Sequence, residues 1–197
     1  MCNRNEIHQA ENVIIEVYGI AGAGKSTYVK KNNNMVKVNV SVFLKLRVLL
    51  RLLTHDLRPL LRLTFRFRDP DRRGIVFFIF YKLNAAELLA RKGKLKYIYD
   101  QGPIYNLSRL LYKSTADEWQ KNQSDFELLL QRIRNAYDET VYLRCPVDIV
   151  MERIRNRDKS HFAQKVETDE ARSRLSKWEQ SYEFIQAKLN SNVIENY

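Results

Sequence analysis

The 197-residue sequence has only two cysteines and no long hydrophobic run. Cys2 and Cys145 cannot build a disulfide framework, so we expect a chain of a reducing, cytoplasmic compartment, with Cys145 as a small buried side chain. The longest apolar run, residues 75–81, is too short to span a membrane, and residues 1–12 lack the apolar core of a signal peptide. These absences argue against disulfide-stapled, membrane-spanning and exported proteins.

Acidic residues are scarce relative to basic ones. The chain has 34 Lys and Arg against 23 Asp and Glu, a formal net charge of +11. Such an excess favours acidic partners, and charge alone leaves nucleotides, nucleic acid and an anionic membrane surface open. Much of the excess lies in residues 43–68, where Asp56 is the only acid among seven cations: Lys45, Arg47, Arg51, Arg58, Arg62, Arg66 and Arg68.

Length and a hydrophobic content of 45% suit one domain, residues 1–197, of the α/β class. Short apolar, strand-like runs alternate with segments of helical periodicity. This alternation predicts a parallel sheet with helices on both faces, a three-layer α/β/α domain. The strand-like runs are residues 13–18, 35–40, 95–99, 139–143 and, more weakly, 192–195.

Apolar spacing also predicts which helical residues form the core. One stripe comprises Ile75, Phe78, Ile79, Lys82, Leu83, Ala86 and Leu89, and a second comprises Phe126, Leu129, Leu130, Ile133 and Ala136. Proline favours the first turn of a helix, because its missing N–H has no partner to lose there. Pro59, Pro103 and Pro146 are therefore expected at helix starts, with a break near residues 54–58.

The most informative segment joins the strand at 13–18 to a glycine-rich loop of the form G-x-x-x-x-G-K-S. Glycines let successive backbone N–H groups turn inward and form a nest for phosphate oxygens. Lys25 would reach the β- and γ-phosphates, and the Ser26 hydroxyl would reach Mg²⁺ at the start of a helix. The segment predicts a nucleoside triphosphate site made by Gly19, Ala21, Gly22, Ala23, Gly24, Lys25, Ser26 and Thr27.

The strand at 95–99 ends in an acid, Asp100. Functional groups of a parallel sheet gather at the carboxyl ends of its strands, so Asp100 should lie on the same rim as the glycine-rich loop. There it can hold Mg²⁺ or accept a proton from an attacking hydroxyl. A plainer role as the cap of a helix starting at Pro103 is compatible with this one.

A third signal follows the strand at 139–143, where a helix ends in a group of arginines. Arg153 and Arg157 lie four residues apart and share a helix face, whereas Arg155 turns away. A solvated basic end would suit the helix dipole. The alternative is a mobile lid over residues 153–167 whose arginines close on the transferred phosphoryl group.

Residues 19–27, Asp100 and the run 141–157 together resemble the P-loop nucleoside and nucleotide kinases, closest to the thymidylate kinase and deoxynucleoside kinase group. The resemblance implies a five-stranded parallel sheet, ATP with Mg²⁺ as donor, and a helical lid. It also implies that Arg153 lies near the adenine or phosphates of ATP and that Arg157 is the lid arginine. Gln101 follows Asp100 where the family usually has arginine, and residues 38–43 lack the usual acid, so thymidine specificity does not carry over.

In such relatives the acceptor binds near the region that corresponds to residues 41–92. Basic side chains recur here at Arg47, Arg51, His55, Arg58, Arg62 and Arg66. One or two could bind an anionic acceptor, while the others could form a solvated or partner-binding face. Neighbouring leucines also leave membrane-surface contact through residues 43–68 open. A homodimer is a further possibility.

The sequence thus predicts an ATP-dependent phosphotransferase with Lys25, Asp100 and Arg157 as catalytic residues. The acceptor would be a small hydroxyl-bearing or anionic molecule, a nucleoside or nucleoside monophosphate. A nucleotide-dependent switch or ATPase and a nucleic-acid 5′-end kinase are the alternatives. A GTPase is disfavoured because Pro103 replaces the glycine of D-x-x-G and no N-K-x-D occurs, and the absence of an L-S-G-G-Q run disfavours a transporter ATPase.

Overall fold

A computed structural model describes residues 12–197 except 33, 39–40, 91–94 and 158–160. Within these residues five parallel strands form one sheet in the order β2-β3-β1-β4-β5. Their bounds are β1 Val13–Tyr18, β2 Val36–Lys37, β3 Lys96–Tyr99, β4 Glu139–Arg144 and β5 Asn192–Glu195. The predicted five-stranded parallel sheet is confirmed. Cys2 and residues 39–40 of the second predicted strand lie outside the described residues.

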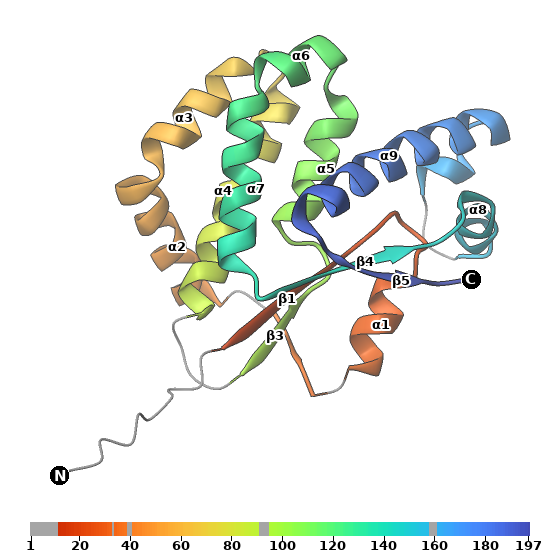
Figure 1. The fold of residues 1–197 in the computed structure, drawn as a ribbon, viewed down its shortest axis with the longest axis horizontal. Helices are drawn as coiled ribbons and strands as arrows, with labels where there is room; N and C mark the ends of the chain where they lie inside the picture. Colours follow the sequence, from red (N-terminus) through yellow and green to blue (C-terminus); the bar gives the residue numbers. More distant parts are fainter. Residues whose placement is uncertain (1–11, 33, 39–40, 91–94, 158–160) are drawn as a thin grey trace.

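Helices cover both sides of the sheet. Helices α4, α5, α7 and α9 lie on one side and α1 lies on the other, as predicted for three layers (Figure 1). The helices are α1 Lys25–Lys31, α2 Val42–His55, α3 Leu57–Arg66, α4 Pro70–Ala90, α5 Pro103–Lys113, α6 Ala116–Lys121, α7 Gln123–Ala136, α8 Val147–Arg155 and α9 Thr168–Leu189, with a short 3₁₀ helix, η1, at Phe162–Gln164.

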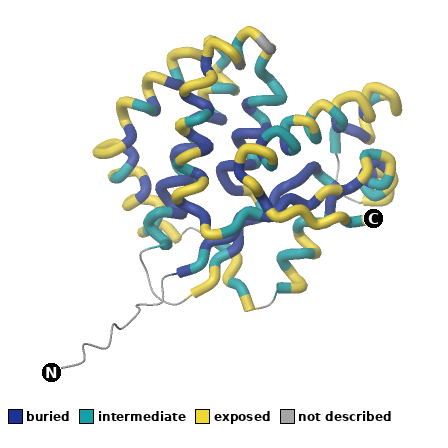
Figure 2. The backbone as a smooth tube through the Cα atoms, viewed as in Figure 1, coloured by how far each residue is buried: buried dark blue, intermediate teal, exposed yellow. Residues whose placement is uncertain are grey.

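Strand β1 lies at the centre of the sheet and is almost entirely buried, as Figure 2 shows. Its alternating side chains face opposite layers. Tyr18 stacks on Tyr142 of β4, with ring centroids 5.3 Å apart, and contacts the ring of Tyr182 on α9. These contacts hold α9 against the carboxyl ends of β1 and β4.

The predicted helix starts are confirmed. Pro59 lies in the first turn of α3, α5 begins at Pro103, and Pro146 caps α8. Helices α2 and α3 are separated at Asp56, whose N–H bonds to Leu52 and ends α2. The two helices are therefore separate elements, and both lie on the outer side of α4, away from α5 and α9 (Figure 1).

The predicted core stripe of α4 is confirmed at Ile75, Ile79, Leu83 and Ala86, which are all buried, and wrong at Phe78. On α4, Phe78 is 51% exposed, whereas Val76 and Phe80 are fully buried. The reason is that α4 packs against α2 and α3 on one side and against α5 and α7 elsewhere, so its buried residues occupy more than one face. All five predicted core residues of α7 are buried.

The predicted basic stripe is partly neutralised within the fold. Arg51 pairs with Glu87 of α4, and Arg62 and Arg66 both pair with Asp125 of α7 at 3.0 Å. These arginines therefore tie α2 and α3 to the helices beneath them, and they do not line a single acceptor pocket.

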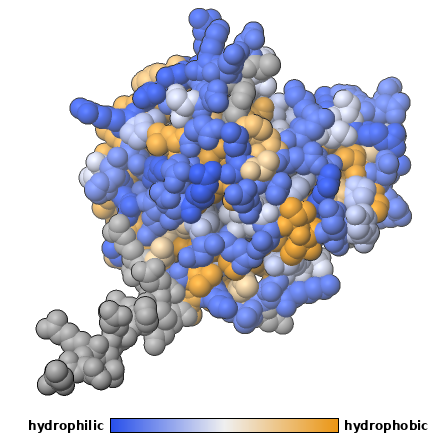
Figure 3. Space-filling view, viewed as in Figure 1, coloured by the Kyte–Doolittle hydropathy of each residue, from blue (hydrophilic) through white to orange (hydrophobic). Residues whose placement is uncertain are grey.

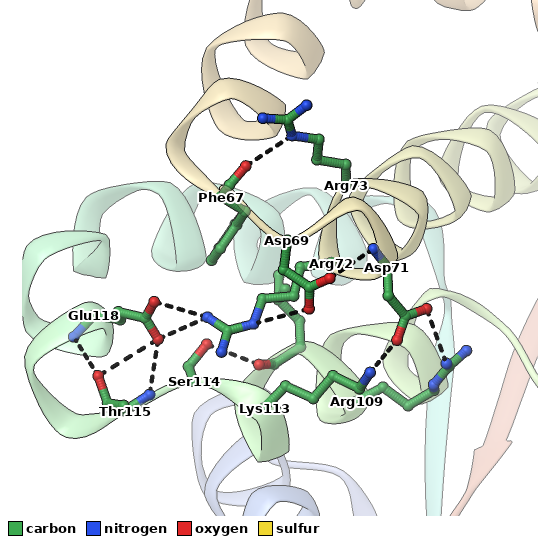
Figure 4. Close-up of polar contacts among 11 residues, drawn as sticks. Phe67, Asp69, Asp71, Arg72, Arg73, Arg109, Lys113, Ser114, Thr115 and Glu118 are labelled. Carbon is green, nitrogen blue, oxygen red and sulfur yellow. Dashed lines mark hydrogen bonds and ion pairs between the residues drawn. The ribbon is translucent and has the colours of Figure 1, made fainter.

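Ionic contacts also fix the beginning of α4 (Figure 4). Arg72 donates to both carboxylate oxygens of Glu118 on α6, at 2.8 and 2.7 Å. Asp71 pairs with Lys113 and, at 3.9 Å, with Arg109, both on α5. The start of α4 thus pairs with the end of α5, and Lys82, farther along α4, lies near Tyr105 at the start of α5, so the two helices run antiparallel.

Candidate active site

The glycine-rich loop joins β1 to α1 as predicted. Gly19, Gly22 and Gly24 all have positive φ angles, of 144°, 95° and 91°. A side chain at Gly22 would also press on Val150 of α8, with its Cβ only 3.0 Å from Val150 Cγ1. Glycine is therefore required both for the backbone conformation and for the close approach of α8 to the loop.

Lys25 is held over this loop. Its Nζ donates to the carbonyl oxygens of Gly19 at 2.7 Å and Ile20 at 2.8 Å. Burial lowers the pKa of Lys25 to about 8, the charge of Asp100 raises it, and the charge of Arg157 lowers it further. Asp100 and Arg157, two other residues predicted to be catalytic, thus lie within electrostatic reach of Lys25.

Asp100 follows the end of β3, on the same rim of the sheet as the loop. Its Oδ2 accepts a hydrogen bond from Lys37 Nζ at 2.9 Å, because β2 is the neighbour of β3. Lys82 of α4 donates to the backbone carbonyl of Gln101. A cavity of about 150 Å³ opens here, lined by Lys37, Val38, Tyr81, Lys82, Ala85, Ile98, Tyr99, Asp100 and Gln101.

A second set of contacts extends from the lysines near Asp100 toward α5. Lys82 Nζ and the guanidinium of Arg109 each lie 5.9 Å from the ring centroid of Tyr105. Burial lowers the pKa of Lys82, the charges of Glu16 and Asp100 raise it, and Arg109 lowers it. Lys37, Lys82 and Arg109 are thus gathered on the Asp100 side of the site. The sequence analysis named none of them as a site residue and placed Lys82 in a core stripe.

On the other side of the loop, Arg153 lies in the last turn of α8, which ends at Arg155. Arg157 lies beyond the helix, so the prediction that the two arginines share one helix face is wrong, although both line the same cavity. Arg153 Nη1 donates to Gly22 O at 3.4 Å and to Cys145 Sγ at 3.3 Å. Arg155 turns away and donates to Thr168 at 2.8 Å. A cavity of about 520 Å³ lies between α8 and the loop, lined by Gly22, Gly24, Thr27, Ile149, Glu152, Arg153, Asn156, Arg157 and Asn196.

The predicted lid of residues 153–167 begins inside α8, which continues to Arg155. Residues 158–160 lie outside the described part of the chain. In the remainder, Gln164 of η1 donates to the carbonyl oxygens of Ile154 at 2.8 Å and Arg157 at 3.2 Å. Helix η1 therefore packs against the end of α8, which carries Arg153, and against the segment just after it, which carries Arg157.

Asn196 is a contact of the loop that the sequence did not predict. Its side-chain amide donates to the Ala23 carbonyl oxygen at 2.7 Å, and its backbone N–H donates to Arg144 O at 2.9 Å. The segment after β5 is thereby bound to the glycine-rich loop.

Glu16, in the middle of β1, is fully buried and lies in register with Tyr99, the residue before Asp100. Its carboxylate accepts backbone N–H groups from Ile104 at 3.0 Å and Tyr105 at 3.3 Å, at the beginning of α5. Burial raises the pKa of Glu16 to about 8, against the lowering effect of these hydrogen bonds and of Lys82. The sequence offered one signal for each of these two residues. Glu16 is an acid in an otherwise apolar strand, and Lys82 is a lysine in an apolar helix stripe.

The residues present fit Mg²⁺ bound together with a polyphosphate. Among the described residues no cluster of three or more His, Cys, Asp or Glu side chains could hold a metal ion alone. Ser26 is exposed in the first turn of α1, beside Lys25, whose pKa responds to Asp100. One hydroxyl and one carboxylate match an ion whose remaining ligands are water and phosphate oxygens.

The sheet order and the loop between β1 and α1 define an α/β protein with a P-loop fold. No protein-family model and no curated protein matches the sequence. Among solved structures, the chain is similar to M. mycoides deoxyadenosine kinase with bound dATP, at 16% identity over 93% of this chain and 89% of that one, with a TM-score of 0.47. The same enzyme with bound dCTP gives 15% identity, coverage of 93% and 90%, and a TM-score of 0.48.

No helix in the described ranges is both long and apolar enough to cross a membrane.

Proposed function

We propose that this chain is an ATP-dependent phosphotransferase that moves the γ-phosphoryl group to a small acceptor, a nucleoside or nucleoside monophosphate. The observation that carries the proposal is the position of Lys25, which is bound to the carbonyl oxygens of Gly19 and Ile20 in the glycine-rich loop and lies within electrostatic reach of Asp100 and Arg157. A cation over the phosphate loop, an acid at the next strand end and an arginine from the opposite side are the parts that phosphoryl transfer requires.

On the donor side, the loop N–H groups and Lys25 would bind the β- and γ-phosphates. Arg153 would face the nucleotide from the cavity between α8 and the loop, and Arg157 would stabilise negative charge on the transferred group. Ser26 and Asp100 would hold Mg²⁺, which supplies charge neutralisation between the β- and γ-oxygens when it is bound.

On the acceptor side, the lysines and arginine beside Asp100 favour a molecule that carries negative charge. Lys37, Lys82 and Arg109 come from three different elements and converge on one side of the sheet rim. A nucleoside monophosphate would use this charge, and its phosphate oxygen needs no base. With a neutral nucleoside, Asp100 would instead accept the proton of the attacking hydroxyl.

The test is a screen of nucleosides, nucleoside monophosphates, sugars and short oligonucleotides with Mg²⁺-ATP, reading ADP release and identifying the phosphorylated product by mass. We expect a nucleoside monophosphate to stimulate ADP release most. Lys25→Ala should lower kcat/KM by about a hundredfold or more. Lys30→Ala, on the exposed side of α1, is the matched control and should leave it unchanged.

Two outcomes would replace the proposal. ATP binding with no acceptor raising turnover above the blank would favour a nucleotide-dependent switch or ATPase. Preferred phosphorylation of an oligonucleotide 5′ end, with affinity that falls steeply as salt rises, would favour a nucleic-acid kinase. Full activity in Lys25→Ala would remove the central assignment.

A further inference from the structure

Helices α2 and α3 bury one side and expose another apolar side to water. Val48, Leu52, Leu60 and Leu63 are buried, and both helices pack on α4. Their opposite sides carry nine large exposed hydrophobic residues, which we call the α2–α3 surface: Val42, Phe43, Leu46, Leu49, Leu50, Leu53, Leu57, Leu61 and Phe65. These are most of the exposed large hydrophobic residues in the described part of the chain.

On α2 the exposed apolar residues form a continuous band. At about 100° per residue, the six from Val42 to Leu53 fall within an arc of about 120° that holds no polar side chain. On α3, Leu57, Leu61 and Phe65 follow at intervals of four and continue the stripe. Val42 at one end is 81% exposed and Phe65 at the other is 72% exposed. The solvent face of a helix in a globular protein is normally polar, so a band of this length marks a binding surface.

The charges beside this band have one sign. Lys45, Arg47 and Arg58 are exposed, and the Arg47 guanidinium lies 5.8 Å from the ring centroid of Phe43. The only acid in α2, α3 and the link between them, Asp56, is buried and bound to Arg132 at 2.8 Å. The α2–α3 surface thus presents hydrophobic side chains bordered by cations and by no acid.

An apolar band with a cationic border favours one of two binding partners, a second copy of this chain or an anionic lipid bilayer. A symmetric dimer would bring the same surface of two copies together and place cations against cations with no acid to pair with. An anionic lipid bilayer offers both an apolar interior and negative headgroups, which is what an amphipathic helix with a basic border binds.

We propose that the α2–α3 surface docks on an anionic membrane surface, with both helices lying in the plane of the interface. The leucine and phenylalanine side chains enter the boundary of the acyl chains, and Lys45, Arg47 and Arg58 contact the lipid phosphates. Because α2 and α3 lie on the side of α4 away from α5 and α9, docking leaves the phosphate loop open to solvent (Figure 1). This inference does not depend on the proposed enzymatic activity.

Vesicle flotation of the full chain tests the proposal. Vesicles of phosphatidylcholine alone are compared with vesicles that contain about one third phosphatidylserine. We expect binding to the anionic vesicles only, weakened by salt. Leu46→Gln/Leu53→Gln, at two positions each 56% exposed, should lower the partition coefficient about tenfold or more. Leu95→Gln, at a position 48% exposed just before β3, is the matched control and should bind like the wild type.

A second variant isolates the charge contribution. Arg47→Gln/Arg58→Gln keeps the apolar band and should weaken binding to anionic vesicles about fivefold per lost charge. Thermal melting of each variant shows that it is folded. The proposal is overturned if neutral and anionic vesicles bind alike, or if the double leucine variant binds like the wild type. It is equally overturned if no vesicle binds and light scattering shows a dimer that the leucine variant dissociates.

Discussion

The carboxylate of Glu16 accepts the backbone N–H of Ile104 at 3.0 Å, joining the central strand to the first turn of α5. Glu16 also pairs in register with Tyr99, the residue before Asp100. The buried Glu16 therefore contacts the chain on both sides of Asp100, at Tyr99 and at Ile104. The protonation of Glu16 is linked to folding, because burial raises the pKa of its carboxyl group to about 8.

Glu16→Gln should flatten the pH dependence of stability. The folded state holds a proton that the unfolded state releases above its ordinary pKa of 4.5. The contribution of Glu16 to the free energy of unfolding is fully present below pH 4.5 and is lost as pH rises through about 8. The glutamine variant cannot ionise, so it should gain stability over the wild type at pH 8 in urea unfolding. Glu127→Gln, at the surface, should keep the wild-type slope, and an equal slope in both variants would contradict this role.

Gly102→Ala should destabilise the fold by about 1–3 kcal/mol. A Cβ at Gly102 would collide with the Glu16 carboxylate. Gly74→Ala is the matched control, because a Cβ there meets open space inside α4 and should stabilise by about 0.5–1 kcal/mol. The double variant Glu16→Ala/Gly102→Ala should show less than the sum of the two single losses in free energy of unfolding. If the two single losses add up to the loss in the double variant, the collision with Glu16 is not the cause of the destabilisation in Gly102→Ala.

Polyphosphate binding should take up a proton near pH 8. The pKa of Lys25 is lowered to about 8, and a bound triphosphate would raise it again by favouring the charged ammonium. ATP affinity should therefore fall as pH rises from about 7 to about 9. Calorimetry in buffers of different ionisation enthalpy measures the proton uptake. Lys25→Arg, which stays charged, should lose it, and Lys30→Ala should retain it.

Asp56→Ala should cost about 2–4 kcal/mol of stability. The buried carboxylate binds Arg132 of α7 and the fully buried Asn84 of α4, so its removal leaves both without this partner. Asp148→Ala is the control, since its pair with Arg172 is exposed and should contribute less than about 1 kcal/mol. Equal losses in the two variants, measured by chemical unfolding, would contradict a structural role for Asp56.

Local pattern was sufficient for much of the fold. The glycine-rich loop, the helix starts at Pro59 and Pro103 and four of the five strands depend on short-range chemistry, and they occur close to where they were predicted. The second strand, predicted over residues 35–40, is observed only at Val36–Lys37 among the residues that the structure describes. The strand-end rule also placed Asp100 on the rim near Lys25. The catalytic roles assigned to these residues remain predictions.

Residues that depend on three-dimensional neighbours were missed. Periodicity gave α4 a single buried face, but α4 packs on several sides, so Phe78 is exposed where burial was expected. Lys37 meets Asp100 only because β2 lies beside β3, an order that no local pattern specifies. The buried Asp56 and its bond to Arg132 likewise depend on how α7 packs against the break between α2 and α3.

The hydrogen bond from Asn196 to Ala23 has a practical consequence. An affinity handle appended after Tyr197 would begin two residues after Asn196, which contacts the glycine-rich loop. Its charge and bulk would lie beside the groups that are expected to bind nucleotide. Nucleotide binding measured on such a fusion would report on the handle as well as on the loop, so the handle belongs at the other end of the chain.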